Sequence, residues 1–195
     1  MKVPRLLVVT DRHQLPPGRT LEHVVRACVA AGAGWVWVRE HDLTAGERRA
    51  LVRRLADVPD ATVVSGREWH PGAAGVHLPA AADAAPDGAG FHGRSCHDNE
   101  EVRRAVAGGA AYLTISPVAA SASKPGHGPA LGTAGTARAV AAAGDVPVLA
   151  LGGVGPADAA GFVEAGAHGV AVMGAVMRAA DPGLVVRRLL AEVSR

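Results

Sequence analysis

Two apolar runs in the last third of the chain end on glycine and could hold an anion. They are "VLALGGV", residues 148–154, and "GVAVMG", residues 169–174. Glycine lets the backbone approach a ligand closely, and backbone N–H groups that follow a strand can bind phosphate. The pattern predicts a phosphate site formed by Gly152, Gly153, Met173 and Gly174. The alternative is that these glycines serve only as tight turns and helix-packing positions.

The segment "GRSCHDNEE", residues 93–101, holds the candidate for proton transfer, His97. It stands at the end of a predicted strand and directly before a helix start at Asp98. The N-terminus of a helix disfavours imidazolium, although Asp98 opposes this, so we expect a neutral ring that accepts and later donates a proton. The alternative is a structural hydrogen bond at the helix start. A nucleophilic Cys96 with His97 as its base is a weaker interpretation, because adjacent residues on a strand point to opposite faces.

The segment "VWVREH", residues 36–41, places a cation and a histidine at another strand end. Arg39 could bind a substrate carboxylate through two hydrogen bonds, or form an ion pair in the neighbourhood of Glu40. His41 could assist proton transfer or contact the same carboxylate, or it could face solvent. Arg67, which follows a further strand, would add positive charge to an anionic pocket or lie exposed.

The stretch "SPVAASASKPGHGPALG", residues 116–132, is long for a loop in a small domain. Loops of this length in compact domains are often binding loops or lids. Ser121, Ser123 and Lys124 could donate hydrogen bonds to an anionic substrate. The alternative is a flexible surface loop without a role in binding.

The elements that position these residues follow from a repeated pattern. An Ala/Gly-rich helix end precedes a short apolar strand in "AAGAGWVWVRE", "GAAGVHLP", "AGGAAYLTISP" and "EAGAHGVAVMG". This junction is typical of alternating helices and parallel strands. The runs "RLLVVTD", "ATVVSG", "GFHGRSC" and "VPVLALGG" bring the number of predicted strands to eight. The sequence therefore predicts an α/β fold, a single compact (β/α)₈ barrel over residues 1–195, with the helices after strands 3 and 4 reduced to a turn or less.

A doubly wound open sheet is the second choice for the fold, but eight units without a long linker favour a closed barrel. In such a barrel the active site lies where the strands run into the following loops, at the C-terminal face. Helix starts are predicted from Thr44 with Glu47 as a capping box, Asp98 with Glu101 as its acidic equivalent, Asp181 followed by Pro182, and a helix beginning near Pro156.

Composition excludes several classes of function. A net charge of +2 and 3% aromatic residues give no basic patch or stacking platform for nucleic acid. The start "MKVPRLLVVTD" has no long apolar stretch, so we expect a cytoplasmic protein without a membrane partner. Cys28 and Cys96 are too few for a disulfide scaffold, and the nine histidines show no metal-ligand spacing.

Seven motifs in order along the chain resemble the thiamine phosphate synthase and TenI-like superfamily. They are "LVVTD", "VWVREHDLT", "GVHL", "GRSCHDNEE", "SPVAASASK", "VPVLALGGV" and "GAHGVAVMGAVM". Individually most of these motifs are weak, whereas seven in order are a strong signal. The resemblance implies a TIM barrel that handles phosphorylated intermediates of thiamine biosynthesis.

The superfamily contains two activities, and this sequence departs from the synthases. Those enzymes join a pyrimidine diphosphate to a thiazole phosphate and hold the diphosphate with magnesium. Their Asn-Asp-Arg at the end of the third strand is matched here by Ser65, Gly66 and Arg67. The carboxylate that usually follows "GVHL" is also missing, since residues 80–82 are alanines and Asp83 is displaced. Magnesium is normally anchored by one or two carboxylates, so the synthase reaction is the alternative, with Glu68 or Asp83 in a rearranged metal site.

The resemblance is closer to the TenI-like thiazole tautomerases, which need no metal. These enzymes aromatise a carboxythiazole phosphate tautomer by moving a proton. The reaction needs a phosphate site, a cation for the carboxylate and a proton-transfer group, which Arg39, His97 and the glycine-ended strands would supply. We therefore expect no cofactor, a small phosphorylated thiazole as the partner, and a homodimer if a helix face is apolar and exposed. A third interpretation is an inactive barrel that only binds a phosphorylated ligand.

Overall fold

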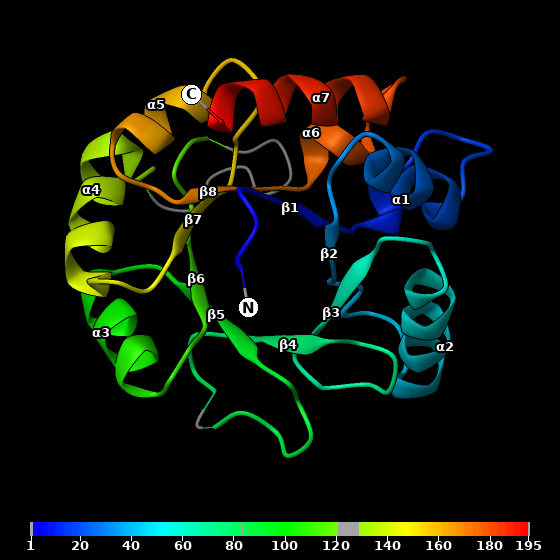
Figure 1. Cartoon of the computed structure of the whole chain (residues 1–195), viewed down its shortest axis with the longest axis horizontal. Coiled ribbons are helices and arrows are strands. Elements are labelled where there is room, and N and C mark those ends of the chain that lie inside the picture. The colour runs from blue at the N-terminus through cyan, green and yellow to red at the C-terminus, as the bar shows by residue number, and fades with distance from the viewer. Residues whose placement is uncertain (1, 83, 121–128, 195) are drawn as a thin grey trace.

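The computed structural model describes residues 2–82, 84–120 and 129–194. Eight parallel strands pair in chain order, and β8 pairs with β1, so the sheet closes into a barrel (Figure 1). The closed barrel confirms the predicted fold class and rules out the open sheet. The strands are β1 Leu6–Val9, β2 Trp35–Val38, β3 Thr62–Gly66, β4 Gly75–Leu78, β5 His92–Cys96, β6 Tyr112–Ile115, β7 Val148–Leu151 and β8 Gly169–Val172.

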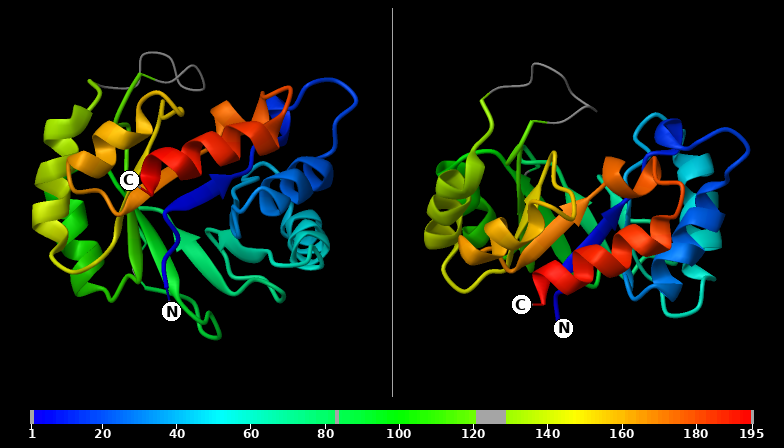
Figure 2. Two further views of the ribbon diagram at one scale, coloured as in Figure 1. Left: turned by 45° about the horizontal axis from the view of Figure 1, so that its top comes forward. Right: turned by 90° about the horizontal axis from the view of Figure 1, so that it is seen from above.

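The helices form an outer ring that has a gap. In the described residues no helix separates β3 from β4 or β4 from β5, as predicted (Figure 1). Helix α7 contacts β1 and lies beside α1 and α5 (Figure 2). The helices are η1 Arg12–Gln14, α1 Leu21–Ala30, α2 Ala45–Ala56, α3 Asn99–Ala107, α4 Gly132–Ala143, α5 Ala159–Glu164, α6 Gly174–Met177 and α7 Pro182–Val193.

Most of the predicted helix starts are confirmed. Thr44 forms the capping box with Glu47, and Asp181 caps α7 with Pro182 in its first turn. Asp98 accepts hydrogen bonds from the backbone of Glu100 and Glu101 and so caps α3.

Two details of these helix starts were predicted wrongly. The carboxylate of Glu101 does not bond the backbone of Asp98; it accepts from the backbone N–H of His97, one residue earlier. Helix α5 begins at Ala159 rather than near Pro156, because a turn over 155–158 comes first, in which Asp158 and Ala159 donate to the carbonyl of Gly155.

Side chains alternate between two apolar layers along each strand, as the pleat requires. The outer layer packs against the helices, and Cys96 on β5 and Cys28 on α1 are both fully buried there. Burial raises the pKa of each thiol to about 12, so Cys96 is not a nucleophile. The inner layer fills the barrel with Leu7, Val9, Trp37, Val64, Tyr112, Leu149 and Ala171.

Within the described part of the chain, no helix is both long enough and apolar enough to cross a membrane.

Candidate functional site

The predicted phosphate-binding residues meet in one pocket at the carboxyl ends of β7 and β8. The pocket has a volume of about 260 Å³ and is lined by residues 151–155 and 171–175, with Ala120 and Arg178 at its edge. Gly152, Gly153, Met173 and Gly174 all line it. We call this space the glycine pocket.

The first two glycines of this pocket adopt a backbone that other residues avoid. Their φ angles are +96° at Gly152 and +72° at Gly153, in the left-handed region. A Cβ on Gly153 would lie 2.8 Å from the carbonyl oxygen of Ala119 and even closer to that of Ala120. The loop after β7 thus packs directly on the backbone of the loop after β6. Glycine at position 153 is therefore needed for its backbone angle and for the lack of a side chain.

Arg178 brings a positive charge to the glycine pocket and was missed in the sequence. Its guanidinium lies against Gly174 and donates a hydrogen bond to Gln14 Oε1. Residues four apart on a helical turn are neighbours, so the spacing of Gly174 and Arg178 was the signal available. Phosphate in this pocket would meet backbone N–H groups of α6 and this guanidinium.

His97 lies just beyond β5, with its side chain half exposed. Its Nδ1 is 2.9 Å from Glu101 Oε2, and its backbone N–H donates to the same oxygen at 2.7 Å. The ring nitrogen Nε2 makes no hydrogen bond to the described residues. The structure therefore orients the His97 ring through one nitrogen and leaves the other available to a ligand.

Arg39 follows β2 and makes no ion pair with the part of the chain that the structure describes. Its backbone N–H donates to Thr10 Oγ1 at 3.1 Å. The suggested pairing of Arg39 near Glu40 is wrong, because Glu40 is taken by Arg12. The carboxylate of Glu40 is buried and accepts from Arg12 Nη1 at 2.9 Å and from the Arg12 backbone at 3.1 Å. A second carboxylate, that of Asp42, also binds Arg12.

His41 lies half buried at the same strand end. Burial, followed by the positive charges of Arg39 and Arg67, lowers its pKa to about 4. The ring is therefore neutral near pH 7. Its Nδ1 is buried without a hydrogen-bond partner in the described structure. This position argues against the solvent-facing interpretation of His41.

Beneath the mouth, His77 is the centre of a buried polar cluster. Its Nδ1 is 3.0 Å from the Tyr112 hydroxyl and its Nε2 is 3.0 Å from Ser95 Oγ. The imidazole packs on the Trp37 indole with ring centroids 3.8 Å apart. Burial lowers the pKa of His77 to about 3, so the ring is neutral. His77 thus lines the barrel as a structural residue with both ring nitrogens hydrogen-bonded.

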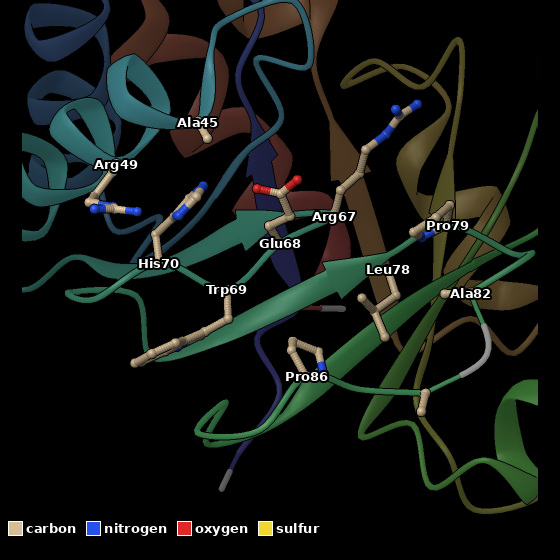
Figure 3. Close-up of a pocket in the computed structure, with 11 residues that line it drawn as sticks. Ala45, Arg49, Arg67, Glu68, Trp69, His70, Leu78, Pro79, Ala82 and Pro86 are labelled. Atoms are coloured by element: carbon tan, nitrogen blue, oxygen red, sulfur yellow. The ribbon is translucent and has the colours of Figure 1, made fainter.

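Arg67 was expected either to add positive charge to an anionic pocket or to lie exposed; it is exposed and does not line the glycine pocket. It borders a second pocket of about 550 Å³ on the outer wall of the barrel, where a helix would otherwise follow β3 (Figure 3). In Figure 3 its guanidinium points away from Trp69 and His70. Strand β3 ends at Gly66, and Arg67 has a φ of +64°, so the chain leaves the extended conformation directly after the strand.

Three predicted binding residues, Ser121, Ser123 and Lys124, lie outside the described residues, as does Asp83.

At the end of β3, the position that matches a magnesium carboxylate of the synthases has no room for one. A Cβ on Gly66 would be 2.9 Å from the carbonyl oxygen of Val38 and 3.0 Å from Trp37 Nε1, so no carboxylate can be built there without displacing its neighbours. The Ser65 hydroxyl donates to the carbonyl of Glu68 at 2.6 Å. Among the described residues no group of three or more His, Cys, Asp or Glu side chains could hold a metal ion.

Comparisons of the sequence with family models and with known proteins point to the same family. A family model described as "Thiamine monophosphate synthase" matches residues 6–176. The chain is 40% identical to the thiamine-phosphate synthase of Salinispora arenicola, over 91% of each chain. It is 36% identical to the thiamine-phosphate synthase of Thermus thermophilus, covering 94% of this chain and 93% of that protein.

A solved structure shares the fold. It is the thiamine phosphate pyrophosphorylase of Pyrococcus furiosus, which superposes with a TM-score of 0.83 at 24% identity and covers 97% of this chain and 95% of that one. At this identity the likeness is one of fold.

Proposed function

We propose that this chain, which belongs to the thiamine monophosphate synthase family, is a metal-independent thiazole tautomerase of thiamine biosynthesis. The glycine pocket binds the phosphate, and Arg39 binds the carboxylate of the carboxythiazole. His97 removes the proton from the ring carbon that carries the carboxylate and returns a proton to the exocyclic alkene carbon. One C–H bond breaks and another forms while the double bond moves into the ring, so the reaction needs no co-substrate.

The observation that carries this proposal is the crowding at Gly66. A synthase of this superfamily is expected to hold magnesium through a carboxylate at this strand end. Here the space that a side chain would need is taken by Val38, Trp37 and His41. The charged groups around His41 are Arg39, Arg67 and Arg48, with Asp42 as the only carboxylate among those that shift its pKa most. Of these, Arg39 makes no ion pair with the described residues, which supports binding of an anionic substrate at this strand end.

The arrangement of His97 also supports the proposal. Glu101 fixes its Nδ1 at 2.9 Å, and the half-exposed ring lies at the same end of the barrel as Arg39 and the glycine pocket. A histidine held by a carboxylate through one nitrogen can use the other to take and return a proton.

The thiamine phosphate synthase reaction is the second candidate. The names of the relatives with 36–40% identity favour it. It predicts strict dependence on magnesium and release of pyrophosphate from a pyrimidine diphosphate. An inactive barrel that binds a phosphorylated thiazole without turnover is the third.

Two assays in succession separate the three. The carboxythiazole phosphate tautomer is mixed with the protein in the presence of EDTA, and its aromatisation is followed by ultraviolet absorbance. The proposal expects acceleration by wild type and its loss in His97→Ala. No acceleration in wild type would reject the tautomerase, and the magnesium assay with both synthase substrates then distinguishes the synthase from a binding protein.

A further inference from the structure

Trp37 closes one side of the barrel mouth. The residue is 5% exposed and belongs to the inner layer of the barrel. Its indole packs on His77, which is itself fixed by hydrogen bonds at both ring nitrogens, to Tyr112 and Ser95. A ring packed against such an anchored partner has little freedom to move aside.

The indole reaches the level of the strand ends. Gly66 is the last residue of β3, and a Cβ on it would lie 3.0 Å from Trp37 Nε1 and 3.1 Å from His41 Cε1. The rings of Trp37 and His41 therefore occupy the space above the end of β3. Trp37 Nε1 and His41 Nδ1 are both buried and have no partner in the described structure, which means that no open space reaches these atoms.

The opposite side of the mouth is open. In the order of the closed sheet, β7 lies across the barrel from β3. Small and apolar side chains, among them Leu151, Ala171 and Met173, leave the glycine pocket of about 260 Å³ there. This volume is below the range of roughly 300–1,000 Å³ of pockets that bury drug-sized ligands. The pocket thus holds the phosphate end of a ligand, and the rest of the ligand extends over the mouth.

We propose that Trp37 determines the specificity of this site by steric exclusion: it limits the ligand to one phosphorylated ring and excludes a two-ring phosphate. A ligand whose phosphate sits in the glycine pocket can extend across the mouth only until it meets the indole. The proposal rests on the proposed function, because it sets the size of substrate that the same site accepts.

The test compares two ligands, a phosphorylated thiazole with one ring and thiamine phosphate with two, by calorimetry on the full chain. Wild type is expected to bind the thiazole at least about tenfold more tightly than thiamine phosphate. In Trp37→Leu, which removes the bulk of the indole, the affinity for thiamine phosphate should rise about tenfold or more, with the affinity for the thiazole changed less than about threefold.

Trp35→Leu is the matched control. Trp35 is the first residue of β2, two residues before Trp37, and points to the same interior. It packs on Phe91 with ring centroids 5.0 Å apart, at the amino end of the strand and not at the mouth. This variant should keep the ligand preference of wild type. If thermal unfolding shows that Trp37→Leu does not fold, Trp37→Phe replaces it, because it keeps a ring against His77. In this variant the affinity for thiamine phosphate should also rise, but by a smaller factor.

The outcomes separate the two proposals. Equal affinity of wild type for both ligands, or an unchanged preference in the folded Trp37 variant, overturns the role of Trp37 and leaves the proposed function standing. The same gain in Trp35→Leu also overturns it, since the effect would then come from loosening the core. A wild type that binds no phosphorylated thiazole rejects the proposed function and the inference with it.

Discussion

One carboxylate oxygen, Oε2 of Glu101, makes two contacts with His97. It accepts a hydrogen bond from the backbone N–H at 2.7 Å and lies 2.9 Å from the ring nitrogen Nδ1. The backbone and the ring of His97 are thus held by a single group on the first turn of α3. Glu101 does not line the glycine pocket, so it acts on a ligand only through His97.

Glu101→Gln should therefore lower kcat and leave KM nearly unchanged. The amide still reaches His97, but the negative charge that would stabilise the protonated ring during proton transfer is lost, and we expect a decrease in kcat of about tenfold or more. Steady-state kinetics of the tautomerisation measure both constants. Glu100→Gln is the control, because Glu100 is exposed and lies near Arg104. An equal loss of kcat in both variants would contradict a positioning role for Glu101.

Gly153→Ala should weaken phosphate binding and destabilise the fold. The new methyl group meets the backbone of Ala119 and Ala120, and φ is +72°. We expect a loss of about 1–3 kcal/mol in the free energy of unfolding and a rise in KM of about tenfold or more. Gly46→Ala serves as the comparison, since Gly46 lies on α2 outside the glycine pocket and its Cβ would meet nothing within 4 Å. Urea unfolding and KM of the two variants should differ clearly; similar values would show that the loop after β7 adapts freely.

Arg39→Ala should reduce affinity for the carboxylated substrate alone. Because Arg39 has no ion-pair partner among the described residues, its removal leaves none of their carboxylates unpaired. The KM for the carboxythiazole phosphate should rise about 10- to 100-fold, whereas the affinity for the thiazole phosphate without the carboxylate should stay within about threefold.

Arg67→Ala is the charge-matched control for Arg39→Ala. Arg67 borders the outer pocket rather than the glycine pocket (Figure 3). Its replacement should change the KM for the carboxythiazole phosphate by less than about threefold. A larger rise in KM in Arg67→Ala than in Arg39→Ala would show that Arg39 is not the residue that binds the substrate carboxylate.

Because of His77, the free energy of unfolding should decrease as the pH is lowered below about 6.5. Burial lowers its folded pKa to about 3, while the unfolded ring takes up a proton near pH 6.5. The unfolded state then binds more protons than the folded state, so the stabilisation is fully present above pH 6.5 and is lost as the pH falls towards 3. Well below pH 6.5 the loss from this residue approaches about 1.4 kcal/mol per pH unit.

Urea unfolding of wild type and His77→Gln between pH 7.5 and 5 checks this prediction. Burial also lowers the pKa of His41, His70 and His92, so part of the slope should remain in the variant. His23 is exposed on α1, and His23→Gln should keep the wild-type slope. An identical slope in His77→Gln would mean that His77 does not contribute.

The sequence was sufficient to predict the fold because its signals are local. Each strand is a short apolar run, and the caps of α2 and α7 lie within three residues of the helix starts. The glycine pocket was also predictable, because its two loops follow β7 and β8, which are neighbours when the strands of a barrel pair in chain order.

Contacts between distant segments could not be predicted in the same way. Glu40 pairs with Arg12, 28 residues away, and not with the adjacent Arg39. The crowding at Gly66 depends on an indole from the previous strand. Nor could the face of Arg67 be predicted, because its φ of +64° interrupts the alternation of the strand.

The gap in the helical ring after β3 has a consequence for the engineering of this barrel. The connection 67–74 joins two adjacent strands along the outer wall without a helix of its own, while β7 and β8 lie on the other side of the closed sheet (Figure 1). New segments inserted into this connection would have room outside the sheet and no effect on the loops after β7 and β8. The barrel can therefore serve as a carrier for an added peptide or domain, with the reaction at its mouth reporting whether the host has kept its shape.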